Sequence, residues 1–230
     1  YMGTPDFAVP PLEALVRSGY EVAAVVTQPD KPKGRGKTLM PTPVKEEAMK
    51  YDIPVYQPLK VRDPEFVEIL ENIAPDIIVV AAFGQIIPKK ILDMPKYGCI
   101  NIHASLLPKY RGAAPIQQAV IDGEKESGVT IMQMGTGLDT GDMISRIVVP
   151  LAKDETGGSL FDKLAQAGAS LLTETLPSIE DGTASYEVQP EESPTPYAAM
   201  INKKMGLMDF SKSAAELERL VRGLNPWPSA

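Results

Sequence analysis

Short apolar runs alternate with segments of helical periodicity along most of the chain. Residues 77–82 (IIVVAA) are apolar at every position, which is typical of a central strand covered on both faces. Strands that alternate with helices form βαβ units and predict a mostly parallel sheet. We therefore expect an α/β fold, doubly wound around a twisted, mostly parallel sheet. The expected strands are 21–27, 53–56, 77–82, 98–103, 128–134 and 143–150, and the expected helices are 10–18, a short one before 53, 64–73, 115–121, 159–176 and 214–222.

The composition changes after the last long helical segment. From Pro177 onward the chain is polar and rich in proline, so we expect one domain over 1–183 and a linker over 184–230. Residues 1–6 have the pattern of a strand end and its turn, and 225–230 that of a proline-rich connector. Further chain is therefore expected on both sides.

Composition and charge narrow the classes of function. The 230 residues carry a net charge of −7, which argues against nonspecific coating of nucleic acid by the whole surface but leaves room for a local basic patch. A single histidine and a single cysteine exclude a multi-histidine zinc site and a cysteine ligand pair, so no metal is expected. No run reaches the roughly 18 apolar residues of a membrane span and no secretory signal opens the chain, so we predict a cytoplasmic protein without a membrane partner.

Two glycine-rich segments fall short of nucleotide-binding motifs. Residues 34–38 (GRGKT) end like a phosphate-binding loop but lack its first glycine, because Lys31 stands at that position. Residues 135–141 (GTGLDTG) have the wrong glycine spacing for a dinucleotide fingerprint, and a strand rather than a helix is expected after them. A nicotinamide cofactor is therefore not predicted.

Candidate chemistry gathers at the end of the expected strand 98–103. Side chains alternate across a strand, so Asn101 and His103 point to one side while Ile100 and Ile102 point to the other. Ligands of open α/β sheets bind beyond the carboxyl ends of the strands. The loop 105–112 is therefore expected to form a wall of a site.

The residue types on this face suit stabilisation of an oxyanion and movement of protons. An asparagine amide can donate to a developing oxyanion, and a histidine can move protons near neutral pH. Asp139 is the natural candidate to orient the ring, although it follows 36 residues later and the spacing establishes no contact. The residues alone leave a second interpretation open, in which His103 is a hydrogen-bonded core residue and Asp139 an ordinary turn residue.

These segments resemble the folate-dependent formyltransferases over essentially the whole chain. The shared elements are 101–103 (NIH), 105–108 (SLLP), 110–112 (YRG) and 137–142 (GLDTGD). Residues 3–7 (GTPDF), 28–37 and 225–228 (NPWP) resemble the members that formylate methionyl-tRNA. The resemblance implies a Rossmann-like formyltransferase fold over 1–183, followed after the linker by an OB-like C-terminal domain beyond residue 230.

The resemblance also implies an activity and its residues. The expected reaction moves the formyl group of 10-formyltetrahydrofolate, a cosubstrate, to the α-amino group of initiator methionyl-tRNA in translation initiation. Asn101 and His103 would stabilise the oxyanion, and Asp139 would hold the ring and help to move a proton. The implied folate-binding residues are Ser105, Leu106, Leu107 and Pro108 with Phe83, Gly84, Gln85, Ile86 and Ile87.

The resemblance makes the loop at 28–43 the candidate tRNA contact, whereas its residues alone are more typical of a solvated surface. It carries Lys31, Lys33, Arg35 and Lys37 without an acidic neighbour from Lys31 onward, and such a concentration of positive charge can bind phosphates. Arg35 is the leading candidate for this contact.

The protein is expected to be a monomer. Two alternative functions remain: a formyltransferase or formyltetrahydrofolate hydrolase that acts on a small molecule, and a noncatalytic module that binds folate or RNA.

Overall fold

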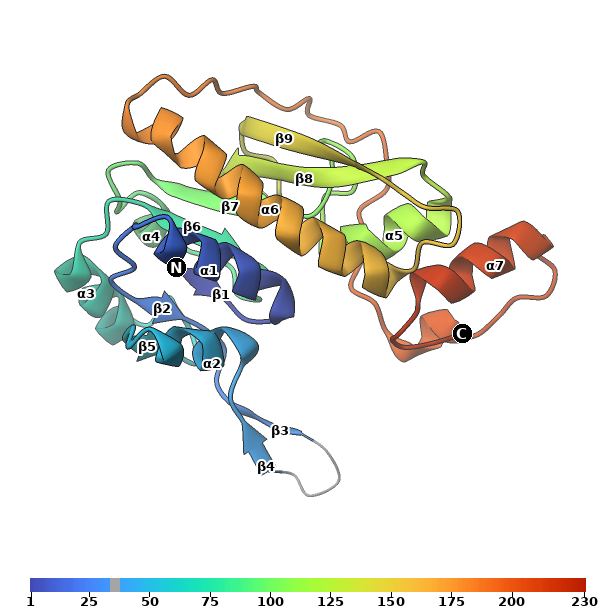
Figure 1. Cartoon of the computed structure of the whole chain (residues 1–230), viewed down its shortest axis with the longest axis horizontal. Helices are drawn as coiled ribbons and strands as arrows, with labels where there is room; N and C mark the ends of the chain where they lie inside the picture. Colours follow the sequence, from blue (N-terminus) through green and yellow to red (C-terminus); the bar gives the residue numbers. More distant parts are fainter. Residues whose placement is uncertain (34–37) are drawn as a thin grey trace.

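A seven-stranded sheet organises the chain (Figure 1). The computed structural model describes residues 1–33 and 38–230, and the sheet order is β5-β2-β1-β6-β7-β8-β9. The pairs from β5 to β7 are parallel, whereas β8 pairs antiparallel with β7 and with β9. The predicted α/β, doubly wound, mostly parallel fold is confirmed. The strands are β1 (Met2–Gly3), β2 (Val25–Val26), β5 (Val55–Tyr56), β6 (Ile78–Ala81), β7 (Cys99–His103), β8 (Glu126–Gln133) and β9 (Met143–Pro150).

Helices cover both faces of this sheet, and the apolar strand residues alternate between them. Val79 and Ala81 of β6 pack in one core cluster, whereas Ile78 and Val80 pack in the other. The first cluster is covered by α1 (Val9–Arg17), α2 (Pro43–Lys50), α5 (Pro115–Asp122) and α6 (Gly157–Glu180), and the second by α3 (Pro64–Ile73) and α4 (Lys89–Leu92).

Strand β7 carries the predicted chemistry at the carboxyl edge of the sheet. It lies between β6 and β8, with Asn101 opposite Val80 on one side and Met132 on the other. Ile100 and Ile102 belong to the core cluster beneath α6, so Asn101 and His103 face the opposite side of the sheet. The alternation predicted from the sequence is therefore present.

The segment predicted as a loop over 28–43 instead contains two short strands that pair as a β-hairpin. Strands β3 (Lys31–Lys33) and β4 (Thr38–Met40) pair antiparallel, with Pro32 opposite Leu39, and the hairpin projects from the body of the protein (Figure 1). Proline and glycine favoured the loop prediction, but a proline is tolerated in an edge strand because its missing N–H has no ladder partner there.

The segment predicted as a linker has two different parts. Beyond α6 the chain runs extended beside β9 and bridges to it at Met143 and Glu187 (Figure 1). Further on, α7 (Ala214–Gly223) packs against α5, preceded by a 3-10 turn at Lys203–Gly206. The division at 183/184 stays a prediction. Within the described ranges, no helix is long and apolar enough to pass through a bilayer.

Candidate active site

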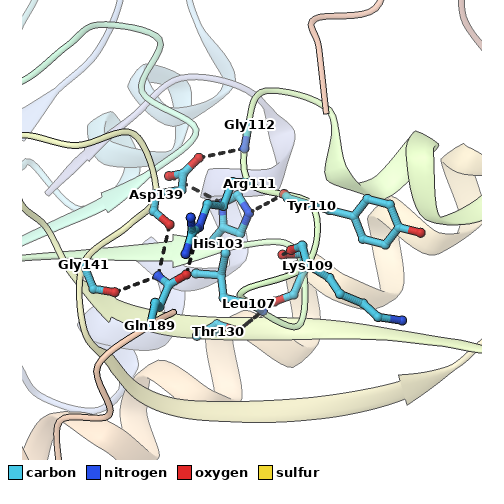
Figure 2. A network of polar contacts seen from close by, with 11 residues as sticks. His103, Leu107, Lys109, Tyr110, Arg111, Gly112, Thr130, Asp139, Gly141 and Gln189 are labelled. Carbon is cyan, nitrogen blue, oxygen red and sulfur yellow. Dashed lines mark hydrogen bonds and ion pairs between the residues drawn. The ribbon is translucent and has the colours of Figure 1, made fainter. Parts of the chain in front are cut away.

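His103 lies between a main-chain carbonyl and a carboxylate (Figure 2). Its Nε2 atom is 3.0 Å from the carbonyl oxygen of Tyr110, and its Nδ1 atom is 3.7 Å from Oδ1 of Asp139. The second carboxylate oxygen of Asp139 accepts a hydrogen bond of 2.9 Å from the backbone N–H of Gly112. The tertiary structure thus brings together two residues that are far apart in the sequence.

The hydrogen-bond chemistry determines which ring nitrogen of His103 carries a proton. A carbonyl oxygen only accepts, so Nε2 donates its N–H to Tyr110. In this tautomer Nδ1 carries the lone pair of the ring, and it faces the carboxylate of Asp139. The His103 side chain is only 6% exposed and that of Asp139 21%, so the carboxylate is the side of the pair that remains open to solvent.

Both partners of His103 adopt a left-handed backbone conformation. The φ angle is 57° at Tyr110 and 52° at Asp139. An aspartate tolerates this region because its short side chain can bond locally, but a tyrosine there is unusual and costs of order 1 kcal/mol or more. Three contacts hold Tyr110 in this conformation: its hydroxyl donates to Glu124 (2.8 Å), its N–H donates to Thr195 (2.7 Å), and its ring is buried.

The environment of Tyr110 keeps its hydroxyl protonated. Burial raises the pKa of the Tyr110 phenol well above its ordinary value, and the hydrogen bond to Glu124 adds to this shift. Burial likewise raises the pKa of the Cys99 thiol to about 12, so this cysteine is no nucleophile at neutral pH. Within the described part of the chain, no three His, Cys, Asp or Glu side chains gather as a metal ion would require.

Asn101 presents its amide on the same face as His103. Its side chain is half-buried, and the structure gives it no hydrogen bond to another described residue. A partly shielded amide that lies two residues along the strand from the imidazole can donate to an oxygen atom of a bound substrate.

The loop after β7 is held by hydrogen bonds to β8 and within the loop itself. Thr130 of β8 is fully buried, and its hydroxyl donates to the Ser105 carbonyl (2.7 Å) while accepting the Leu107 N–H (3.1 Å). The Ser105 hydroxyl in turn donates to the Lys109 carbonyl (2.7 Å). Ser105 and Leu107 are therefore buried parts of the loop, and Leu106 and Pro108 are its half-buried members.

The second predicted folate segment, 83–87, follows β6 at the same edge of the sheet. Phe83 and Ile87 are buried in the core cluster beneath α3 and α4, whereas Ile86 is 80% exposed. The Gln85 side chain accepts from the Val61 N–H and donates to the Pro58 carbonyl. Gly84 has a φ of 85°, and it lies in the turn between Phe83 and Gln85.

Cavities lie on two sides of the molecule. One of about 290 Å³ is lined by Leu106, Leu107 and Pro108 together with Arg146 and Pro194. A larger one of about 450 Å³ lies at the opposite end of the strands, around Tyr1, and contains none of the predicted catalytic or folate-binding residues. Because the chemistry of an open α/β sheet lies beyond the carboxyl ends of its strands, the larger cavity is not the candidate active site.

Two of the four basic residues predicted for tRNA lie on β3 of the hairpin. Lys31 is exposed on β3 and Lys33 ends that strand, whereas Arg35 and Lys37 lie outside the described residues. Lys45, at the far end of the same basic stretch, is paired with Asp30 at 2.8 Å. The hydrogen bonds from Lys45 and Gln57 hold the pKa of Asp30 below its ordinary value.

Two buried polar residues beside the site were not predicted as site residues. The Arg111 guanidinium and the Gln189 amide are each 7% exposed and are joined by a hydrogen bond of 3.1 Å. Arg111 follows Tyr110 in a segment that the resemblance singled out, but nothing in the polar composition around Gln189 marks it. Only the burial of Gln189 among exposed neighbours in the folded chain distinguishes it.

Comparisons with known proteins agree with this architecture. The sequence matches the family described as formyl transferase over residues 1–176, and the formyl transferase C-terminal domain over 200–230. The structure of an N-formyltransferase from Helicobacter canadensis, in complex with folinic acid and dTDP-3-aminofucose, shares the fold. Its TM-score is 0.71 at 22% identity, covering 96% of this chain and 78% of that one.

Sequence relatives are much nearer. A methionyl-tRNA formyltransferase from Agathobacter rectalis is 62% identical over all 230 residues, which span 74% of that relative's length. The methionyl-tRNA formyltransferase of Bacillus subtilis is 55% identical over the same residues, which span 72% of its length. At this identity over the full chain, and with the fold and edge geometry described above, the chain belongs to the methionyl-tRNA formyltransferase family.

Proposed function

We propose that this chain transfers the formyl group of 10-formyltetrahydrofolate to the α-amino group of methionyl-tRNA, as in translation initiation. The observation that carries the proposal is the meeting of His103 with Asp139 at the carboxyl end of β7, on the face that also presents Asn101. The names of the full-length relatives support the acceptor, and the folinic acid in the structural relative supports a folate donor.

The reaction needs stabilisation of charge more than it needs a strong base. An α-amino group has a pKa of about 7.7 to 8, so a useful fraction is unprotonated at neutral pH. Its attack on the formyl carbon forms a C–N bond and a tetrahedral intermediate with an oxyanion and a positive nitrogen. The free amide of Asn101 donates to the oxyanion, and a protonated His103 ring stabilises it by charge.

Breakdown of the intermediate requires one proton to change nitrogen. The attacking nitrogen loses a proton, the C–N10 bond breaks, and N10 leaves as the N–H of tetrahydrofolate. Asp139 is the more exposed side of the His103 pair, and its role in this proposal is to accept the proton from the amine. The ring, held at Nε2 by Tyr110, keeps Nδ1 directed at that carboxylate. Asp139 then passes the proton on to N10 as the C–N10 bond breaks, so the number of protons on the protein is unchanged at the end.

The remaining parts of the proposal concern binding. Backbone groups of 83–87 would contact the pteridine, and Leu106 and Pro108 offer the accessible surface of the 105–108 loop. Lys31, Lys33, Arg35 and Lys37 would contact tRNA phosphates through the projecting hairpin. We propose a monomer that acts in the cytoplasm.

A comparison of acceptors tests this function against its nearest alternative. Purified protein with 10-formyltetrahydrofolate is offered methionyl-tRNA, a nucleotide-linked amino sugar, glycinamide ribonucleotide or no acceptor. We expect formylation of methionyl-tRNA alone. Formylation of a small amine, or release of formate without an acceptor, would instead support the small-molecule transferase or the hydrolase.

A second experiment separates catalysis from simple binding. Asn101→Ala and His103→Ala should each lower kcat by about 100-fold or more while the Kd for tetrahydrofolate changes little, because these groups act on the transition state. The exposed Lys96→Ala is a control with unchanged turnover. If both site variants turned over at the parental rate, the chain would be a noncatalytic binding module.

A further inference from the structure

An extended segment crosses the loop that supports His103. We call residues 189–198 the strap. It holds the loop through side chains and backbone: Ser193 donates to the Pro108 carbonyl (2.8 Å), Thr195 accepts the Tyr110 N–H, and the Ala198 N–H donates to the Arg111 carbonyl (2.8 Å). The strap therefore contacts the same loop whose backbone binds His103 and Asp139.

The strap and the loop are in close contact at Gly112. A Cβ atom at this position would lie 2.6 Å from the Ala198 carbonyl oxygen, and the φ angle of 126° also requires glycine. The N–H of this glycine donates to Asp139. Movement of the strap would consequently move a donor of the proposed catalytic carboxylate.

The first residues of the strap bind the buried guanidinium of Arg111. The Arg111 guanidinium has no carboxylate partner among the described residues, so its burial depends on hydrogen bonds to neutral acceptors. All three acceptors belong to the strap: Oε1 of Gln189 (3.1 Å), the Pro190 carbonyl (2.7 Å) and the Glu191 carbonyl (3.0 Å).

The amide nitrogen of Gln189 contacts the turn that carries Asp139 (Figure 2). Nε2 of Gln189 donates to the carbonyl of Asp139 (3.0 Å) and to that of Gly141 (2.7 Å). Two acceptors on one side and a cationic donor on the other leave only one orientation for the amide. A glutamate could not donate to the carbonyls, and a methionine could serve neither side.

We propose that Gln189 is a positioning residue for formyl transfer: it ties the 139–141 turn to Arg111 and so holds the Asp139 carboxylate opposite His103. Asp139 has a left-handed backbone, and its turn is partly exposed, so the turn needs an external anchor to stay in one conformation. The inference rests on the proposed function where it is tested by kinetics. Its spectroscopic test does not depend on that function.

The experiment compares three variants with the parent protein. Gln189→Met removes all three hydrogen bonds at similar volume, and Gln189→Glu retains the acceptor for Arg111 but loses both donors. Glu191→Ala is the control, because only the main-chain carbonyl of Glu191 is used. The measurements are kcat and KM for each substrate, the melting temperature, and the ¹⁵N signals of the His103 ring, which are unique because the chain has a single histidine.

We expect Gln189→Met and Gln189→Glu to lower kcat about tenfold, with each KM within about twofold of the parental value, and to shift the Nδ1 signal of His103. The control should match the parent. If the methionine variant does not fold, the glutamate variant alone tests the inference.

Parental kcat and parental ring signals in both folded Gln189 variants would overturn the inference, even if the melting temperature fell. If the parent formylated no acceptor, the proposed function would fail, and the ring signals would still decide the positioning role: a shift supports it and parental signals overturn it.

Discussion

His103 donates its Nε2 proton to the main-chain carbonyl of Tyr110 across 3.0 Å. This bond assigns the tautomer of the ring, because the partner can only accept. In the neutral form the proton should therefore reside on Nε2, with Nδ1 free toward Asp139.

Nitrogen-15 NMR checks this tautomer directly, since the single histidine gives one pair of ring signals. We expect the shifts of an Nε2–H tautomer at a pH where the ring is neutral. A neutral ring with its proton on Nδ1 would contradict this arrangement, because Nε2 could then not donate to the Tyr110 carbonyl.

Removing the charge of Asp139 should slow the chemistry with little effect on binding. In Asp139→Asn the amide oxygen can still accept the Gly112 N–H, but its NH₂ group replaces the proton-accepting oxygen opposite Nδ1. We expect kcat to fall about 100-fold and KM to change less than threefold, because the carboxylate acts in proton transfer.

Steady-state kinetics with both substrates measure this effect. Asp162→Asn, which removes an exposed carboxylate from α6, is the matched control. A kcat within threefold of the parent in Asp139→Asn would remove Asp139 from the proposed mechanism.

The pair formed by Tyr110 and Glu124 should make stability depend on pH. Burial of Glu124 opposes its ionisation, but the hydrogen bonds from Lys109 and Tyr110 outweigh it and hold the pKa of Glu124 below its ordinary value of 4.5. A carboxylate with a lower pKa in the folded state stabilises the protein above the unfolded value, and this contribution is lost as pH falls through the folded value.

Urea unfolding of the parent and of Glu124→Gln at several pH values measures this contribution. The parent should be the more stable protein near pH 7, and the difference in free energy of unfolding should shrink below about pH 4.5. Glu126→Gln changes an exposed carboxylate of β8 and should show no such trend. A difference that stayed constant with pH would contradict a stabilising role for the ionised group.

The basic hairpin should determine part of the salt dependence of tRNA binding. Arg35→Ala is expected to weaken methionyl-tRNA binding and to lower the slope of log K against log salt by about 1, because one phosphate contact is lost. Tetrahydrofolate binding should be unaffected. Lys89→Ala removes the same charge from α4 and is the control.

Titrations of methionyl-tRNA at several salt concentrations measure both slopes. If Arg35→Ala and the parent had equal slopes, the hairpin would not contact phosphates.

Local sequence patterns predicted most elements of the fold. Helix α3 matches its predicted range, and the apolar run in β6 marks the centre of the sheet because both of its faces are covered. The hairpin β3–β4 was missed, since its strands are short and its pairing does not depend on an apolar face. The helix α4 was missed for a similar reason, because four residues give no measurable periodicity.

By itself, the sequence determined that Asn101 and His103 share one face at the end of a strand, because alternation along a strand is a local property of the backbone. Tertiary structure alone decided that Asp139 meets His103, that the carbonyl of Tyr110 holds the ring, and that Gln189 links Arg111 to the 139–141 turn. The contacts of Asp139 and Gln189 join segments remote in sequence, and those made to the carbonyls of Tyr110 and Asp139 use main-chain atoms that every residue type carries. These contacts depend on how the whole chain folds, so no local residue pattern establishes them.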